Sequence, residues 1–179
     1  MPRKWKTIET KSIFGNKVFG LREDKVLSPK TDNTHPVWVI DAPTWVNIIP
    51  LTKENKIIMV KQYRFGNREI SLEIPGGMVE PEEDPLLAAK REMEEETGYS
   101  ADEILEIGKI SPNPAFMSNY LFTYVANNVE KIGDQKLDDM EDIEVLEVDL
   151  NRIPTLITEG KIDHSLVISA FYLLNQFEL

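Results

Sequence analysis

The chain has 179 residues, 41% of them hydrophobic, and a formal net charge of −11 at pH 7. This length allows one substantial core with at most a small accessory module, and the acidic balance argues against nucleic acid or an anionic membrane as partner. The chain contains no cysteine, which excludes disulfides, a thiolate nucleophile and a cysteine zinc site. Without an apolar signal core or an apolar run of about 18 residues, we expect a soluble, cytoplasmic protein.

Short strands are predicted at the start of the chain. Apolar and charged residues interleave between residues 7 and 26, and a strand resumes at 37–40 after a polar stretch, 28–36, that we interpret as a linker or turn. Two or three strands cannot bury much surface alone. We therefore expect residues 1–43 to form a small N-terminal β module that packs on a second domain, in the same chain or in another subunit, and residues 44–179 to form that domain.

Three more strands are predicted before the central motif, at residues 45–51, 56–63 and 70–74. The last of them leads directly into Gly76 and Gly77. Two consecutive glycines let the backbone bend sharply and approach a ligand, which makes the carbonyl group of Gly76 a candidate metal ligand. A tight turn without a ligand is the other interpretation.

The next stretch predicts a well-delimited helix. Asp84 suits the N-cap, Pro85 the first helical position and Gly98 the left-handed residue that ends a helix. Glu94 is expected to point away from the other glutamates near the end of this helix.

Those other glutamates, Glu92, Glu95 and Glu96, have i, i+3, i+4 spacing and share one flank of the helix. Carboxylates near a helix C-terminus oppose the macrodipole by about 0.3–1 kcal/mol each, and Glu92 and Glu96 repel each other. The cluster is either a solvated acidic face or the site of a cation. Oxygen ligands without histidine or cysteine favour Mg²⁺ or Mn²⁺ over zinc.

The rest of the chain alternates strands, loops and helices. The predicted elements are strands at 104–110, 120–126 and 143–148, a short helix within 149–160 and a final helix capped by Asp163. The apolar stripe of the final helix consists of Leu166, Ala170, Phe171, Leu174 and Phe177. Because strands and helices do not alternate as βαβ units, we expect an α+β fold with a mixed sheet between helices.

The central motif resembles the signature of the Nudix hydrolases over its full length. The fixed positions present here are Gly77, Glu83, Arg91, Glu92, Glu95, Glu96 and Gly98. Tyr99 stands where the signature has an aliphatic residue. The resemblance implies an α/β/α sandwich and hydrolysis of a nucleoside diphosphate linked to another group, through metal-activated water.

The resemblance also implies roles for the charged residues of the motif. Glu92 and Glu96 are expected to bind the metal ion first and Glu95 next, with Glu95 also a candidate catalytic carboxylate. Glu83 and Arg91 are expected to pair and to orient these glutamates; an ordinary surface ion pair is the alternative.

Further features are similar to the ADP-ribose pyrophosphatase branch, whose members often take several nucleoside diphosphate sugars. They are VKQYRFG at 60–66 with LEIPGG at 72–77, Pro114, the acidic loop at 138–142 and GKID at 160–163. This likeness implies that Arg64 contacts the diphosphate. It implies that Glu141 is a loop metal ligand or the general base, with Asp139 the other candidate base, unless the loop is only a solvated acidic turn.

In this branch the N-terminal strands are exchanged between the subunits of a homodimer, which residues 1–43 are suited to do. Trp5, Trp38 or Trp45 would then stack on the nucleobase, or serve in packing. The loop at 112–119, with Ser118 as candidate substrate-binding residue, lacks the glycine found in many ADP-ribose hydrolases.

The expected function is therefore Mg²⁺-dependent hydrolysis of nucleoside diphosphate sugars, of the ADP-ribose or GDP-mannose type, with Mn²⁺ as a possible substitute. The alternatives are hydrolysis of dinucleoside polyphosphates or oxidised nucleotides, and a non-catalytic sensor of nucleotide sugars. We assign no role to His35 and His164.

Overall fold

The computed structural model describes residues 1–177, and its chain divides into two compact units. The first consists of Met1–Pro43 with Ser111–Tyr120, and the second of Thr44–Ile110 with the chain from Leu121 onward. Within residues 1–177, no helix is both long and apolar enough to cross a bilayer.

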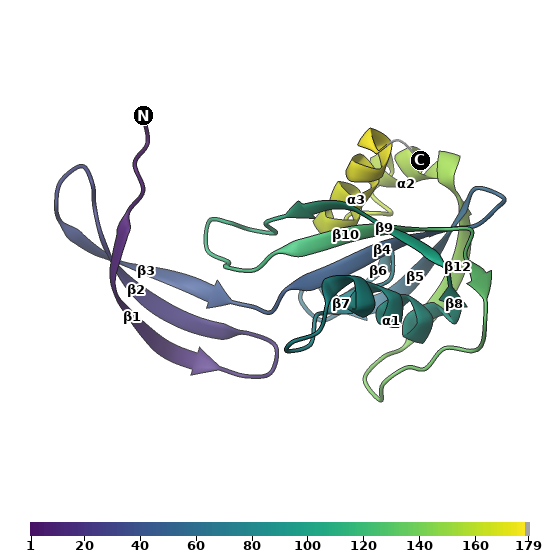
Figure 1. Cartoon of the computed structure of the whole chain (residues 1–179), viewed down its shortest axis with the longest axis horizontal. Helices are drawn as coiled ribbons and strands as arrows, with labels where there is room; N and C mark the ends of the chain where they lie inside the picture. The colour runs from purple at the N-terminus through teal and green to yellow at the C-terminus, as the bar shows by residue number, and fades with distance from the viewer. Residues whose placement is uncertain (178–179) are drawn as a thin grey trace. The chain divides into compact units, whose positions relative to one another are not determined.

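The first unit holds an antiparallel sheet of three strands in the order β1-β2-β3 (Figure 1). The strands are β1 (Lys6–Gly15), β2 (Gly20–Leu27) and β3 (Thr34–Asp41). The expected linker through Pro36 was too long, because β3 already begins at Thr34. Proline cannot donate to a neighbouring strand, but β3 is an edge strand of this sheet, where proline is tolerated.

The second unit is built on a mixed sheet in the order β12-β5-β4-β10-β9, in which β4 and β10 are parallel. Its strands are β4 (Trp45–Leu51), β5 (Lys56–Arg64), β6 (Glu69–Glu73), β7 (Gly76–Met78), β9 (Glu103–Ile110), β10 (Leu121–Asn127) and β12 (Ile143–Asp149). Two short strands, β8 (Tyr99–Ser100) and β11 (Glu130–Lys131), pair with each other. The helices are α1 (Pro85–Thr97), the 3₁₀ turn η1 (Leu150–Arg152), α2 (Ile153–Thr158) and α3 (Ser165–Gln176).

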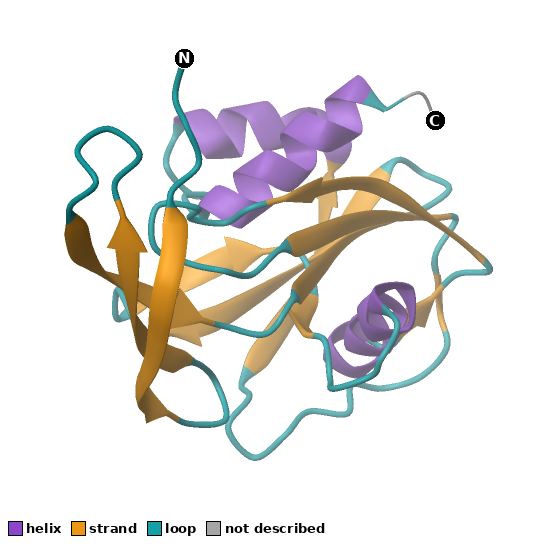
Figure 2. Ribbon diagram, turned by 60° about the vertical axis from the view of Figure 1, so that its left-hand side comes forward, coloured by secondary structure: helices purple, strands orange, loops and turns teal. Residues whose placement is uncertain are grey.

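Helices cover both faces of this sheet (Figure 2). Alternate residues of a strand face opposite sides, so Ile48 and Ile58 pack with α1, while Ile49 and Met59 pack with α2 and α3. The predicted α/β/α sandwich is therefore confirmed.

The central strands β4 and β5 are paired over only part of their length. β4 and β5 pair only at Leu51 and Ile57; further along, β5 pairs with β6 and β4 with β7. Residues 73–76 connect β6, which pairs with β5, to β7, which pairs with β4. Within this connection the carbonyl of Pro75 accepts a hydrogen bond from the amide of Ile48 at 3.0 Å. The short strand β7 was not predicted, because three residues carry too weak a pattern.

The ends of α1 are as predicted. Asp84 caps it by accepting a hydrogen bond from the amide of Leu86 at 2.8 Å, Pro85 is its first residue, and Gly98 has a φ of 73°. The predicted cap of α3 is wrong: His164, not Asp163, precedes the helix, and no side chain caps it. In the buried stripe of α3, Val167 stands where we expected Leu166, and Phe177, also expected there, follows the end of the helix.

Candidate active site

Gly76 and Gly77 let the strand β7 lie close to the backbone of β4 and to the carboxylate of Glu92. Neither has a positive φ. A Cβ atom on Gly76 would lie 2.8 Å from the Cα of Asn47 and closer still to the carbonyl oxygen of Val46, while one on Gly77 would lie 2.5 Å from the Cδ of Glu92. The glycines are required for close approach, to a strand backbone and to a carboxylate, rather than for a left-handed bend.

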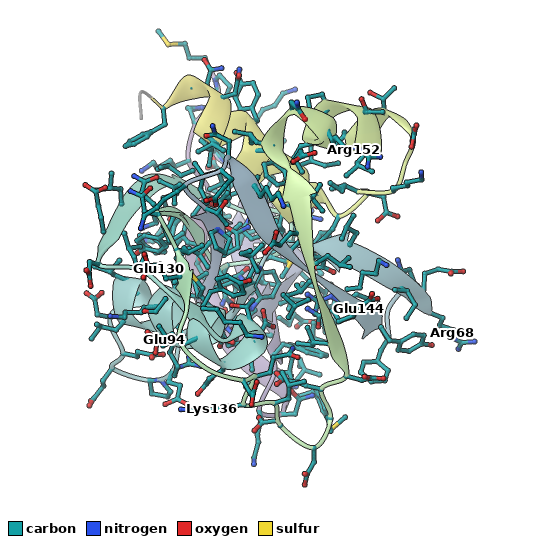
Figure 3. All side chains as sticks on the ribbon, turned by 90° about the vertical axis from the view of Figure 1, so that its right-hand side faces the viewer. Arg68, Glu94, Glu130, Lys136, Glu144 and Arg152 are labelled. Carbon is teal, nitrogen blue, oxygen red and sulfur yellow. The ribbon has the colours of Figure 1, made fainter. Side chains whose placement is uncertain are left out.

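Arg91 is the centre of the ion pairs on α1. Its Nε and Nη2 donate to the two carboxylate oxygens of Glu83, each at 3.0 Å. Its Nη1 donates to Glu92 at 2.9 Å and to Glu95 at 3.1 Å. The pair expected from the motif, Glu83 with Arg91, is therefore brought together, and the same guanidinium also neutralises two of the predicted metal ligands. Glu94 points elsewhere and accepts a hydrogen bond from Ser100 at 2.6 Å (Figure 3).

Glu96 is almost completely buried, with 3% of its surface exposed, and its Oε2 accepts a hydrogen bond from the amide of Gly76 at 3.1 Å. Burial, with added repulsion from Glu92 and Glu141, raises the pKa of Glu96 to about 8 against the hydrogen bond from Gly76. Burial also raises the pKa of Glu92, although Arg91 opposes it. These carboxylates converge, and a proton or a cation is needed to offset their repulsion.

The segment that leads into the acidic loop at 138–142 is tied to the C-terminal end of α1. Gln135 donates to the carbonyl of Glu96 at 2.7 Å, and the amide of Lys136 donates to the carbonyl of Glu95 at 2.8 Å. Figure 3 labels Lys136 in this segment. These carbonyls belong to the last turn of the helix, which lacks partners within the helix. The loop thereby brings Glu141 within electrostatic reach of Glu92 and Glu96. Both Glu141 and Asp139 are exposed to solvent.

A second charged cluster surrounds Glu73, which is 2% exposed. Arg64 donates from Nε and Nη2 to its two oxygens at 2.7 and 2.6 Å, and His164 Nδ1 lies 3.0 Å from Oε2. Burial alone would raise the pKa of Glu73, but the hydrogen bonds from Arg64 and His164 lower it to about 2. We missed Glu73 and His164 in the sequence. The sequence feature that could have identified Glu73 is its position between Leu72 and Ile74 in a predicted strand. A glutamate buried there requires a positively charged or hydrogen-bonding partner.

Ser118 belongs to the first unit. Its hydroxyl donates to Asp41 at 2.6 Å, its amide donates to the carbonyl of Ile40 at 3.1 Å, and Asp41 also pairs with Arg22. The structure thus uses the hydroxyl of Ser118 to hold the loop at 111–120 against β3.

The carboxylates of this site fit a hard divalent cation in chemistry, because all are oxygen donors. Burial of Glu96 among other carboxylates is a second indication. Among residues 1–177, however, no group of three or more histidine, aspartate or glutamate side chains is arranged to hold a metal ion. Glu92 and Glu95 are held by Arg91, so these side chains must rotate away from it before a cation can bind.

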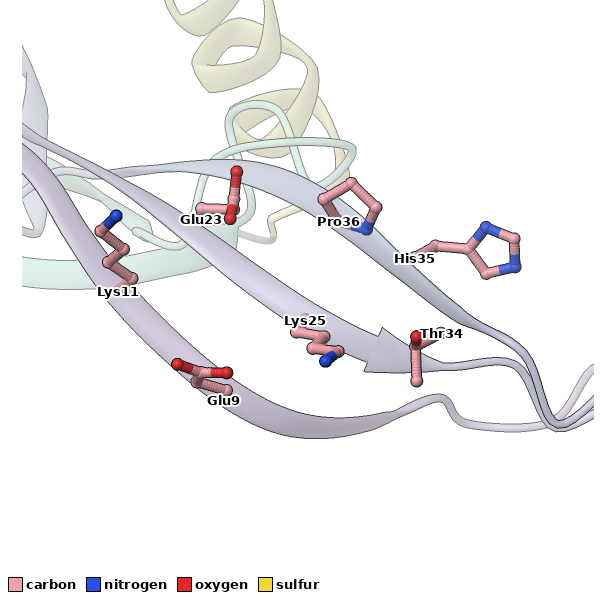
Figure 4. A pocket seen from close by; sticks show the side chains of 7 residues that line it. All are labelled: Glu9, Lys11, Glu23, Lys25, Thr34, His35 and Pro36. Carbon is pink, nitrogen blue, oxygen red and sulfur yellow. The ribbon is translucent and has the colours of Figure 1, made fainter.

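A polar cavity of about 300 Å³ lies on the three-stranded sheet of the first unit (Figure 4). Glu9 is opposite Lys25 and Lys11 is opposite Glu23, so neighbouring strands present opposite charges there. None of the predicted site residues lines it.

Comparison with known proteins gives concordant matches. The NUDIX domain family model matches residues 43–171. The chain is 36% identical over 170 residues to the methanol dehydrogenase activator of Bacillus methanolicus, covering 94% of this chain and 91% of that protein. It is 35% identical over 146 residues to the ADP-ribose pyrophosphatase of Bacillus subtilis (strain 168), covering 81% and 78%. A crystal structure of an ADP compounds hydrolase has a TM-score of 0.85 over 97% of this chain and 94% of its own, with 20% identity, a likeness of fold.

Proposed function

The chain belongs to the Nudix family, in the branch of the ADP-ribose pyrophosphatases, and from this premise we propose that it hydrolyses nucleoside diphosphate sugars with a divalent cation. The products would be a nucleoside monophosphate and a sugar phosphate. The observation that carries the proposal is that two carboxylates of α1 lie against β7, Glu92 beside Gly77 and Glu96 on the amide of Gly76, with Glu141 acting electrostatically on both.

The residues that would hold Mg²⁺, or Mn²⁺ in its place, are Glu92, Glu95, Glu96 and the carbonyl of Gly76. Glu141 would join them only where Asp139 is the base. When bound, the cation supplies positive charge to the diphosphate and lowers the pKa of a bound water molecule. Arg91 would keep its bidentate contact with Glu83 while it releases Glu92 and Glu95. Glu83 and Arg91 would then orient the ligands from outside the metal shell.

The protein's other residues bind substrate and accept a proton. Arg64 would donate to a diphosphate oxygen through the Nη1 that Glu73 does not use. Glu141 would take the proton from the attacking water, because of the two candidate carboxylates it is the one that acts electrostatically on Glu92 and Glu96. Asp139 is the second candidate for this step.

We propose that residues 1–43 form a dimerisation module and residues 44–179 the catalytic domain. Every residue of β1 is exposed. The large apolar side chains left exposed in this module are Met1, Trp5, Ile8, Ile13, Phe14, Val18, Phe19, Val37 and Trp38. A three-stranded sheet with this much exposed apolar surface needs a partner, and a second copy of the chain is the partner we propose. In the homodimer, Trp5 or Trp38 would stack on the nucleobase.

The test of the proposed activity is a substrate panel. Purified protein with MgCl₂ is incubated with ADP-ribose, GDP-mannose, a diadenosine polyphosphate and nucleoside triphosphates, and products are resolved by chromatography. We expect cleavage of the sugar nucleotides, abolished by Glu96→Gln and retained in the control Glu94→Gln, whose side chain faces Ser100. Cleavage of triphosphates without cleavage of sugar nucleotides would refute the proposal. Light scattering after size exclusion separately tests for the dimer.

One comparison favours a second candidate function. The relative matched over 94% of this chain is, by its name, an activator of methanol dehydrogenase. A regulatory action on a dehydrogenase is therefore the alternative. It is tested by adding the protein, or Glu96→Gln, to a methanol-oxidising dehydrogenase and following the rate. Activation by both forms would favour binding without hydrolysis, and activation by the unmodified protein alone would make hydrolysis part of the effect.

A further inference from the structure

We propose that Glu73 and His164 are positioning residues that fix the guanidinium group of Arg64 for the diphosphate, an inference that rests on the proposed function. Neither residue is in the Nudix signature, and they lie 91 positions apart in the sequence. They meet only because β6 and the start of α3 converge on Arg64 at the end of β5.

The contact between Arg64 and Glu73 determines both where the guanidinium lies and how its plane is oriented. The two parallel hydrogen bonds, 2.7 Å from Nε and 2.6 Å from Nη2, form the bidentate geometry of arginine with a carboxylate. Within residues 1–177, Nη1 makes no hydrogen bond, and 43% of the Arg64 side chain is exposed. The edge that carries Nη1 is therefore presented to solvent by an otherwise immobilised group.

Glu73 is suited to this task because it is itself held firmly. Its side chain is 3% exposed, and its strand leads within three residues to Gly76, whose amide binds Glu96. The intervening Pro75 is held to β4 through the amide of Ile48. One short, rigid segment thus carries the carboxylate that orients Arg64 and the amide that contacts a candidate metal ligand. This coupling sets the position of Arg64 relative to the carboxylate site, and Arg64 acts electrostatically on Glu96.

His164 completes the arrangement from the start of α3. An ionised carboxylate can only accept, so Nδ1 of His164 carries the proton that it donates to Oε2 of Glu73. Arg64 Nη2 donates to that same oxygen. His164 therefore restrains rotation of the carboxylate, while Glu73 keeps both hydrogen bonds from Arg64 without it. We expect loss of His164 to weaken substrate binding less than loss of Glu73.

The experiment is a double-mutant cycle on binding. The dissociation constant of α,β-methylene-ADP with MgCl₂ is measured by calorimetry for the unmodified protein, Arg64→Ala, Glu73→Gln and the double variant. We expect each single variant to raise it about 10- to 100-fold, as for loss of a charged hydrogen bond, and the double variant to equal Arg64→Ala. His164→Phe is expected to raise it about two- to tenfold. The control Glu147→Gln breaks another ion pair of the same sheet, 3.0 Å long, and is expected to have no effect.

The inference would be overturned if the unmodified protein did not bind the ligand, or if Glu73→Gln bound it unchanged. It would also be overturned if the fold-changes in dissociation constant of the two single variants multiplied in the double variant, because independent effects indicate a general structural role. Melting curves check folding, and if Glu73→Gln does not fold, Glu73→Asp replaces it, since it keeps the charge but withdraws the carboxylate. The substrate panel separates the two proposals. If the unmodified protein hydrolyses sugar nucleotides and Glu73→Gln binds the ligand unchanged, the proposed activity is supported and the role of Glu73 is refuted. If the dissociation constants of the double-mutant cycle are as expected but sugar nucleotides are not hydrolysed, the role of Glu73 is supported and the proposed activity is refuted.

Discussion

Two adjacent alanine substitutions should separate stability from activity: Gly76→Ala should lower the stability of the fold, whereas Gly77→Ala should lower activity with little change in stability. A Cβ on Gly76 would lie 2.8 Å from the Cα of Asn47, whereas carbon atoms in contact are about 3.5–4.0 Å apart. The obstructing atoms are backbone and cannot rotate away, so β7 must separate from β4. Such overpacking costs about 1–3 kcal/mol. For a chain of this size, that lowers Tm by about 2–12 °C.

The Cβ on Gly77 meets a movable group instead. All three of its nearest atoms belong to the carboxylate of Glu92, the end of a flexible side chain. We expect a Tm within about 2 °C of the unmodified protein, because displacing the carboxylate leaves the strand in place. The displaced Glu92 should no longer reach the cation, with activity reduced about 10- to 100-fold.

The assay is thermal unfolding with and without MgCl₂, together with steady-state hydrolysis of ADP-ribose. Gly15→Ala is the matched control, since a Cβ on Gly15 meets nothing within 4 Å and its φ is not positive. The reverse pattern, in which Gly77→Ala loses stability while Gly76→Ala keeps the original Tm, would refute the reasoning about close approach.

Three further predictions concern the charged groups. MgCl₂ should raise the Tm of the unmodified protein but not of Glu96→Gln, because the cation offsets carboxylate repulsion; an equal rise in both would exclude Glu96 as a ligand. Glu141→Gln should lower kcat about 100-fold or more and Asp139→Asn only slightly, and the opposite order would identify Asp139 as the base. Glu73, whose pKa is lowered to about 2, stabilises the fold by about 3 kcal/mol above pH 4.5, a contribution lost as pH falls towards about 2. Urea unfolding across this range should show a smaller loss in Glu73→Gln, and an equal loss would contradict the pairing.

The sequence was sufficient to predict the ends of an element where the residues that fix those ends are close in sequence to the backbone groups they act on. The ends of α1 follow from Asp84, Pro85 and Gly98, each of which acts on backbone groups nearby. The acidic flank of α1 followed from helical periodicity in the same way. The start of α3 was misplaced by one residue because Asp163 has the right chemistry for a cap but lies one position too early.

Long-range contacts explain what was missed. Pro36 was interpreted as part of a linker because whether a strand lies at the edge of a sheet depends on its neighbours, not on its own residues. The strand β7 exists because β4 diverges from β5 and leaves room for it.

At the site, the grouping of acidic and basic side chains on α1 follows from helical spacing, since residues three and four apart on a helix are neighbours in any fold. Three contacts of the site depend instead on the folded arrangement: Arg91 holds Glu92 and Glu95, Glu96 is buried against Gly76, and Glu73 joins Arg64 to His164. The reason is physical: burial and partner choice arise from segments packed together across the sheet, and no spacing along the chain encodes that packing directly.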